Sequence, residues 1–121
     1  MSSDRFRKVA LALPGTSEGA HQRHADFRVG KRIFATLGYP DDAWGMVKLT
    51  PEQQTVLVEA EPEIFRPVPG GWGKHGNTNV RLARADATTL QSALTMAWNN
   101  VALKSQVKAR DRVNSRGAKK P

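Results

Sequence analysis

The chain begins with a helical pattern of apolar residues. Four of them recur at the spacing that places side chains on one stripe of a helix: Phe6, Val9, Ala10 and Leu13. Asp4 is placed to cap this helix, and the pair Pro14-Gly15 is placed to end it. We therefore predict a first helix that buries its apolar stripe and leaves its basic residues in solvent.

A period of two replaces the helical spacing in the next part of the chain. Apolar and polar residues alternate in three short segments, which span residues 25–29, 32–37 and 44–49. Gly30-Lys31 can turn the chain between the first two segments, and residues 38–42 form a loop before the third. Short alternating segments joined by tight turns are typical of an antiparallel meander of strands.

Two further helices can be predicted from their capping residues. Thr50, Pro51 and Gln53 supply a cap, a proline at the first helical position and the partner of a capping box, so a second helix runs to about residue 60. Asp86 is placed to cap a third helix. The apolar stripe of this helix ends near Leu103 and contains Leu90, Leu94, Ala97, Trp98 and Val101.

One domain accounts for the whole pattern. Residues 79–84 alternate again as in a strand, so helix, strands, helix, strands and helix follow one another. This order predicts an α+β fold, a two-layer arrangement in which an antiparallel sheet is covered on one face by helices. We assign residues 1–103 to a single domain and residues 104–121 to a basic tail that either extends the last helix or is disordered.

The tail carries most of the net charge. The whole chain has 19 Lys and Arg residues against 11 Asp and Glu residues, a formal charge of +8. Residues 104–121 hold seven of the basic residues and one acidic residue, which gives the tail +6 and leaves the body only +2. Such a tail attracts nucleic acid or an anionic membrane surface, or it serves only to keep the protein soluble.

The composition argues against several classes of protein. Without cysteine, the chain has neither a disulfide nor a thiolate metal site. Residues 1–6 are polar where a signal peptide has an apolar core, and no apolar run reaches membrane-spanning length. We expect a cytoplasmic monomer that uses no cofactor and does not enter a membrane.

The glycine-rich segment 67–77 contains a misleading motif. Gly71, Gly73 and Gly76 match the spacing of a dinucleotide-binding loop. That loop needs a strand before it and a helix N-terminus after it, whereas this segment contains two prolines upstream and runs into the alternating residues 79–84. We therefore expect a flexible loop or hairpin arm that carries Trp72 and Lys74. A Walker phosphate loop is excluded because histidine follows Lys74 where serine or threonine is required.

Residues arranged for catalysis are scarce. No serine lies in a nucleophile elbow, and His21 and His24 resemble half of a metal site without a further ligand at a recognised spacing. We predict neither a catalytic residue nor a bound metal, and we expect the protein not to be an enzyme. A small-ligand site is an alternative, and its residues would be Glu18, His21, His75 and Trp72.

Basic and aromatic residues favour a binding surface. They cluster at the first hairpin and at the second β element: Arg23, Arg28, Lys31 and Arg32 in the first, and Trp72, Lys74, His75 and Arg81 in the second. Cations of this kind contact phosphates, while an aromatic ring enters a groove or stacks on a base. The plainer interpretation is that the cations are solvated, that Trp44 and Trp98 belong to the core and that Trp72 anchors a loop.

Several blocks of the sequence, taken in order, resemble the MmcQ/YjbR family. They lie between about Phe6 and Lys104 and comprise residues 12–15, 17–21, 27–37, 48–52 and 71–76, followed by 80–82. The resemblance implies the order α-β(3)-α-β(2)-α, with a secretion-chaperone-like or frataxin-like arrangement. It also implies DNA binding through two wings, which fall on residues 28–32 and 72–76. A chaperone-like adaptor that binds a protein partner through the exposed sheet is a further alternative.

Overall fold

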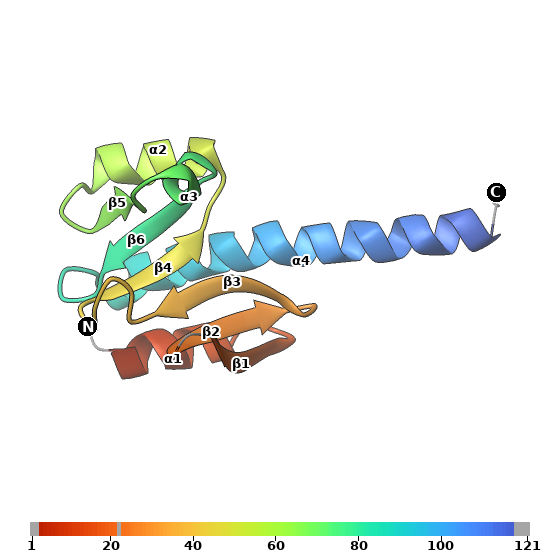
Figure 1. The fold of residues 1–121 in the computed structure, drawn as a ribbon, viewed down its shortest axis with the longest axis horizontal. Helices are drawn as coiled ribbons and strands as arrows, with labels where there is room; N and C mark the ends of the chain where they lie inside the picture. The colour runs from red at the N-terminus through yellow and green to blue at the C-terminus, as the bar shows by residue number, and fades with distance from the viewer. Residues whose placement is uncertain (1–2, 22, 118–121) are drawn as a thin grey trace.

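The computed structural model describes residues 3–21 and 23–117, with side chains as far as residue 102. The elements follow one another as α1 (Ser3–Leu11), β1 (Thr16–His21), β2 (His24–Val29), β3 (Arg32–Leu37), β4 (Trp44–Lys48), α2 (Pro51–Ala60), β5 (Phe65–Pro67), α3 (Gly71–Lys74), β6 (Asn77–Arg81) and α4 (Ala87–Gly117) (Figure 1).

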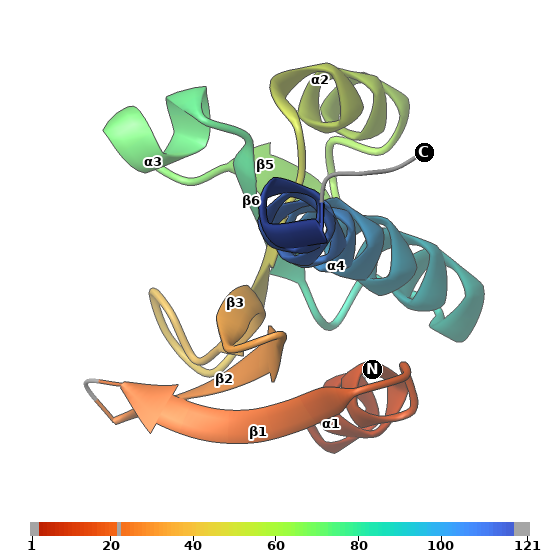
Figure 2. The same ribbon diagram turned by 90° about the vertical axis from the view of Figure 1, so that its right-hand side faces the viewer.

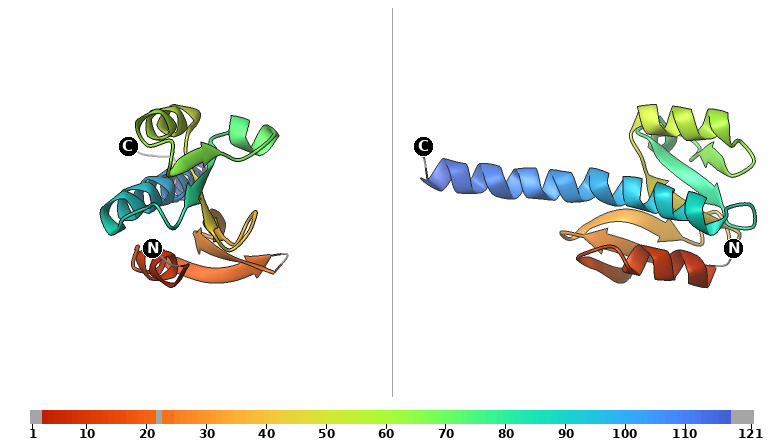
Figure 3. Two further views of the ribbon diagram at one scale, coloured as in Figure 1. Left: turned by 90° about the vertical axis from the view of Figure 1, so that its left-hand side faces the viewer. Right: turned by 180° about the vertical axis from the view of Figure 1, so that it is seen from behind.

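The six strands form one antiparallel sheet in the order β1-β2-β3-β4-β6-β5. α1 and α4 pack together on one face of this sheet, and α2 packs against β5 and β6 (Figure 3). No helix of the described chain lies across the opposite face, on whose side α3 and the β1–β2 hairpin project (Figure 2). We call this the uncovered face. The structure confirms the predicted α+β fold.

Besides β5, which the residue pattern did not indicate, two elements differ from the prediction. β1 was not predicted, so four strands rather than three precede α2. Its residues are exposed or only partly buried, and no apolar alternation marks it as a strand. The predicted loop or hairpin arm is also wrong in part, because Gly71–Lys74 forms one turn of helix between β5 and β6. This turn closes with hydrogen bonds from His75 N to Gly71 O at 3.3 Å and from Gly76 N to Gly73 O at 3.0 Å.

The core lies between the sheet and the pair α1 and α4. Its largest fully buried side chains come from four regions of the chain that are far apart in sequence: Phe6, Phe27, Phe34, Phe65, Leu90 and Leu94. A register shift in the β2–β3 pairing allows the consecutive residues Phe34 and Ala35 both to be buried. Trp98 packs at the margin of this core, and its indole N–H donates to Pro14 O at 2.9 Å. The core thus joins α4 to the first helix and holds the sheet from one side.

The predicted helix starts are confirmed for α2 and α4. Thr50 and Gln53 exchange the two capping-box hydrogen bonds, at 2.9 and 3.1 Å. Asp86 Oδ1 accepts from Thr89 N at 2.7 Å, and this hydrogen bond lowers the pKa of the Asp86 carboxyl. These caps are formed by neighbouring residues, so the tertiary fold is not needed to specify them.

α4 continues well past the packed region of the domain. Val101 and Ala102 are the last buried residues among those whose side chains are described, and the backbone remains helical to Gly117 and projects beyond the sheet (Figure 1). The helix α4 therefore includes residues 104–117 of the predicted tail. Residues 118–121, with Lys119 and Lys120, lie outside the described residues. Within the described chain, no helix is both long enough and apolar enough to cross a membrane.

Candidate functional site

A cavity of about 500 Å³ lies on the uncovered face. Ile33, Thr36 and Met46 of the two central strands β3 and β4 form its floor, and pairing of Thr36 with Met46 places these two on the same face. The residues around the floor come from the β1–β2 hairpin, the β3–β4 loop, the β5–α3 segment and the start of β6: His21, His24, Tyr39, Val68, Pro69, Trp72 and Asn77. The site is therefore assembled from the whole width of the sheet.

Aromatic rings stand exposed at the margin of the cavity. The side chain of Trp72 is 65% exposed and that of Tyr39 is 54% exposed. Tyr39 meets the His24 ring edge to face, with the centroids 5.9 Å apart. Large exposed rings beside an apolar cavity are typical of a surface that binds a planar group. The lining can therefore provide stacking contacts and only a few hydrogen bonds.

Hydrogen bonds fix the segment between β5 and β6 that carries Trp72 and forms one wall of the cavity. Asn77 Nδ2 donates to Trp72 O at 3.0 Å, and Gln54 Nε2 of α2 donates to both Gly73 O and Asn77 O at 3.0 Å. Gly73 allows close backbone packing here, because a Cβ atom would lie 1.9 Å from Val68 O. The wall is consequently a defined structure that holds an exposed indole.

The same segment does not form a dinucleotide-binding loop. β5 precedes it, which the sequence did not indicate, but β6 follows Gly76 where a helix N-terminus is required to hold a pyrophosphate. Gly76 has a positive φ of 106°, and a Cβ atom there would lie 2.1 Å from Leu49 O. The spacing of the glycines thus reflects the backbone packing of this turn.

A buried carboxylate lies on the uncovered face beside the cavity. Asp26 is completely buried and accepts from Arg28 Nε at 2.7 Å and from Arg28 Nη2 at 3.0 Å. His21 Nδ1 lies 2.8 Å from Asp26 Oδ2, the oxygen that also accepts from Arg28 Nη2. The Arg28 guanidinium lowers the pKa of Asp26, and this effect together with that of His21 outweighs burial, which acts in the opposite direction. Asp26 in turn raises the pKa of Arg28.

This cluster changes the role that can be assigned to Arg28. The sequence suggested a phosphate contact, but the guanidinium is already paired with Asp26 by two hydrogen bonds. Gly19 lies opposite Asp26 in the β1–β2 pairing, and a Cβ atom there would be 2.9 Å from Asp26 Oδ1. The local sequence therefore leaves room for the ion pair, and Arg28 adds little net charge to this face.

The other predicted basic residues do not form one patch. Arg23 and Lys31 lie at two different hairpin turns, where each has a positive φ. Arg32 pairs with Val29 and Arg28 with Ile33, so the register places Arg32 and Arg28 on opposite faces of the sheet. Lys74 and His75 are exposed at the end of α3, which lies far from the β1–β2 hairpin on the same side of the sheet (Figure 2). Arg81 is exposed on the uncovered face, in β6.

The predicted small-ligand residues are brought together only in part. His21 and Trp72 both line the cavity. Glu18 pairs in register with Phe27, on the helix-covered face, and binds Arg7 Nε at 3.0 and 3.1 Å. His75 is exposed and is not part of the cavity lining. Among the described residues, no three histidine or acidic side chains are grouped so as to hold a metal ion.

A family model described as YjbR matches residues 11–100, from the end of α1 to the packed part of α4. The chain belongs to the YjbR family. A solved structure of Deinococcus radiodurans protein DR2400, whose family-model domain is DUF419, is 25% identical and superposes with a TM-score of 0.74. The match covers 92% of this chain and 86% of that one. No curated protein matches the chain.

The YjbR match includes the whole sheet and the cavity but stops before the basic tail. All ten residues that line the cavity lie within residues 11–100. The α4 extension lies outside that range. The cavity of the uncovered face therefore lies within the residues that match the YjbR family model, whereas residues 104–121 lie outside that match.

The sequence missed one aromatic and basic cluster of this YjbR domain. Trp44 was expected in the core, and it is indeed only 7% exposed, but its register with Arg81 places it on the uncovered face. There it is covered by two arginines, with Arg66 Cζ 4.0 Å and Arg81 Cζ 4.8 Å from the ring centroid. The alternation of Phe65 and Arg66 is the one local signal that Arg66 faces outward.

Proposed function

We propose that this protein binds nucleic acid, with DNA as the expected ligand, on the uncovered face of its sheet and without catalysing a reaction. The observation that carries the proposal is the exposed Trp72 indole at the margin of an apolar cavity, with Lys74 beside it and Arg23 at the turn across from it. Stacking of bases on aromatic rings next to cations that contact the backbone is a common mode of nucleic-acid binding.

The proposed contacts divide between bases and phosphates. Trp72 and Tyr39 offer ring faces to an unstacked base, while Lys74 and Arg23 offer charge to the backbone on either side. Because a base must leave its stack to enter the cavity, single-stranded or locally opened DNA should bind more tightly than an uninterrupted duplex. The basic residues after residue 103 add affinity that does not depend on sequence.

Fluorescence anisotropy with labelled oligonucleotides tests this proposal. If about five phosphates are neutralised, the logarithm of the association constant for a duplex should fall with the logarithm of salt concentration with a slope near −4.5. Replacing Trp72 by alanine should weaken single-strand binding by about tenfold, since a stacked base contributes roughly 1–3 kcal/mol. Val56→Ala is the matched control, because Val56 on α2 is also 65% exposed but does not line the cavity.

Three results would count against the proposal. They are an affinity that does not change with salt, an absence of binding at low salt, and an equal loss of affinity in the Trp72 and Val56 variants. A chain that ends at Leu103 separates the role of the tail, because it keeps the buried residues of α4 described through Ala102 and removes the basic residues from Lys104 onward. If only the tail-containing chain binds DNA, the uncovered face is not the interface.

A small planar ligand is the second candidate function, and the volume of the cavity favours it. A cavity of about 500 Å³ is within the usual range of ligand sites. Screening metabolites by the side-chain NMR signals of His21 and His24 would detect such a ligand, and His21→Ala should abolish the response. If these signals stay unchanged across the screen while DNA binds, only the proposal of nucleic-acid binding remains.

A further inference from the structure

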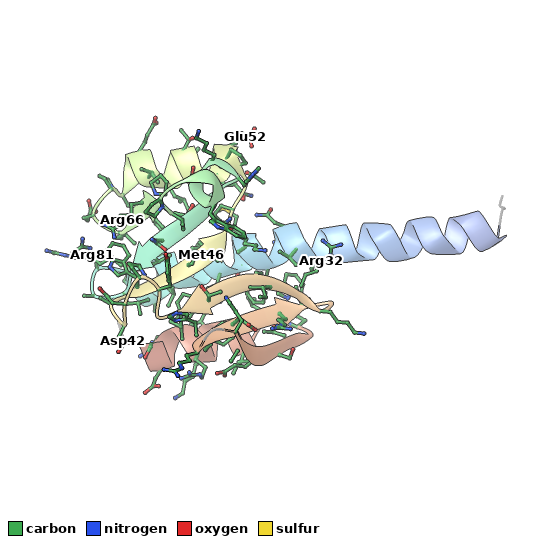
Figure 4. The ribbon with its side chains drawn as sticks, in the orientation of Figure 1. Arg32, Asp42, Met46, Glu52, Arg66 and Arg81 are labelled. Carbon is green, nitrogen blue, oxygen red and sulfur yellow. The ribbon has the colours of Figure 1, made fainter. Side chains whose placement is uncertain are left out.

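Trp44 holds two arginines on the uncovered face. Arg66 comes from β5 and Arg81 from β6, and they lie next to each other at one end of the sheet (Figure 4). Their Cζ atoms are 4.0 and 4.8 Å from the centroid of the same indole, so they are at most the sum of these distances, 8.8 Å, apart. The attraction of each cation to the ring orients both guanidinium groups.

Neither of these cations has an acidic partner within the described residues. Arg7, His21 and Arg28, in contrast, each lie in an ion pair with an aspartate or glutamate. Arg66 and Arg81 instead contact the indole, and their side chains donate no hydrogen bond to the described chain. Two like charges are therefore held close together while their N–H groups remain available for an anion.

The chemistry of two arginines on one ring selects a particular anion. A carboxylate has two oxygens and satisfies one guanidinium fork, whereas a phosphate group has enough oxygens to accept from two forks at once. A guanidinium that lies over an aromatic ring keeps its N–H groups in its own plane, where they can form paired hydrogen bonds at the ring edge. We propose that Arg66 and Arg81, held on Trp44, form a binding site for a phosphate group.

The proposed phosphate site adjoins the cavity. Met46 lies two residues after Trp44 on the same strand and face, and it forms part of the cavity floor. Two residues span about 7 Å along a strand. The site is nonetheless independent of the proposed function, since a phosphate can be carried by a nucleic-acid backbone or by a free phosphorylated molecule.

NMR of the full chain tests the site directly. Two phosphate probes are titrated separately: inorganic phosphate, and a thymidine oligonucleotide whose only phosphates are the backbone diesters. The titrations follow the Nε–H signals of Arg66 and Arg81 and the indole N–H signal of Trp44. Sodium acetate at the same ionic strength is the control for the anion. We expect saturable shifts at all three signals with at least one of the two phosphate probes, and none with acetate.

Two lysine variants separate a built site from general attraction. Arg66→Lys and Arg81→Lys keep the charge but lose the planar fork, so each should weaken phosphate binding by about tenfold or more, as followed by the Trp44 signal. Arg84→Lys, an exposed arginine three residues after Arg81, is the matched control and should bind as the original chain does.

The outcomes distinguish the source of the phosphate and can overturn the site. Saturation by inorganic phosphate supports a site for free phosphate groups, and saturation by the oligonucleotide alone supports a site for backbone diesters. Saturation by neither probe, equal shifts with acetate, or an equal loss in Arg84→Lys overturns the proposal. Trp72→Ala should leave the titration with inorganic phosphate unchanged, so failure of the cavity as a base site is seen separately.

Discussion

The two faces of the sheet bury their side chains by different means. On the helix-covered face, α1 and α4 exclude water from apolar residues such as Phe27 and Val80. On the uncovered face, Asp26 is fully buried in contact with Arg28 and His21, and Trp44 is covered by two arginines. The first face is protected by other elements of the fold, and the second by side chains of its own strands.

This difference indicates which face can change without unfolding the protein. Displacing α1 or α4 would expose the core, which provides most of the stability of a small domain. Side chains that cover one another on the surface of a sheet can instead move by rotamer changes when a ligand binds. The stability of the domain should therefore depend mainly on the covered face, and its binding properties on the uncovered one.

Replacing Phe27 by alanine tests the stability of the covered face. Phe27 is fully buried against the ring of Phe6, so its loss should reduce the free energy of unfolding by about 3–5 kcal/mol. Met46→Ala, on the floor of the cavity and only partly buried, should cost less than half as much. Urea denaturation measures both, and equal losses would show that the two faces contribute alike.

Two glycines of α3 test how the wall of the cavity is built. Gly73→Ala should destabilise the domain by about 1–3 kcal/mol, because its Cβ would overlap Val68 O. Gly71→Ala should change stability by less than about 0.5 kcal/mol, since no atom lies within 4 Å of its Cβ position. Thermal unfolding of the two variants provides the comparison. A neutral Gly73→Ala would mean that the wall can move freely.

The Asp26 cluster should make stability depend on pH. Because the folded-state pKa of Asp26 is lowered, its contribution is present above the unfolded value of about 3.9 and is lost as the pH falls through the lower folded value. Asp26→Asn should cost about 1–3 kcal/mol near neutral pH. Urea titrations at several pH values should show that the free energies of unfolding of the variant and the original chain become more similar below about pH 4. A difference in free energy that stays constant with pH would exclude this role for the ionised carboxylate.

Replacing Asn79, on the uncovered face, should stabilise the domain, whereas most of the variants above destabilise it. Asn79 is completely buried, and its amide N and O have no hydrogen-bond partner within the described chain. Asn79→Val should therefore raise the free energy of unfolding by about 1 kcal/mol. Asn77→Val, two residues earlier on the same strand, should lower it, because that amide binds Trp72 O. Thermal unfolding of the two variants tests both expectations. An Asn79→Val variant that is less stable than the original chain would indicate a structural role for the amide.

The sequence indicated features that depend on neighbouring residues and missed those that depend on strand register. The cap of α2 could be predicted because Thr50 and Gln53 lie within one turn of each other. β1 could not, because an exposed edge strand has no need of alternating apolar residues. Its absence from the prediction also concealed the pairing that brings His21 to Asp26.

The candidate site shows the same limit. Trp72 could be singled out because a tryptophan among glycines is conspicuous in sequence. The contact of Arg66 with Trp44 could not, since it requires β6 to lie between β5 and β4. Arg28 looked like a free cation until the register placed it beside Asp26. The sequence therefore identifies the basic residues, but it does not show which of them are neutralised by an ion pair.

Gln54 belongs to α2 but donates to two carbonyl groups of the wall that carries Trp72. A force that shifted α2 along its axis would therefore pull on the Trp72 segment. This helix packs beside the end of the sheet through the partly buried Leu57 and Val58. The position of the cavity wall thus depends on a helix that does not itself line the cavity.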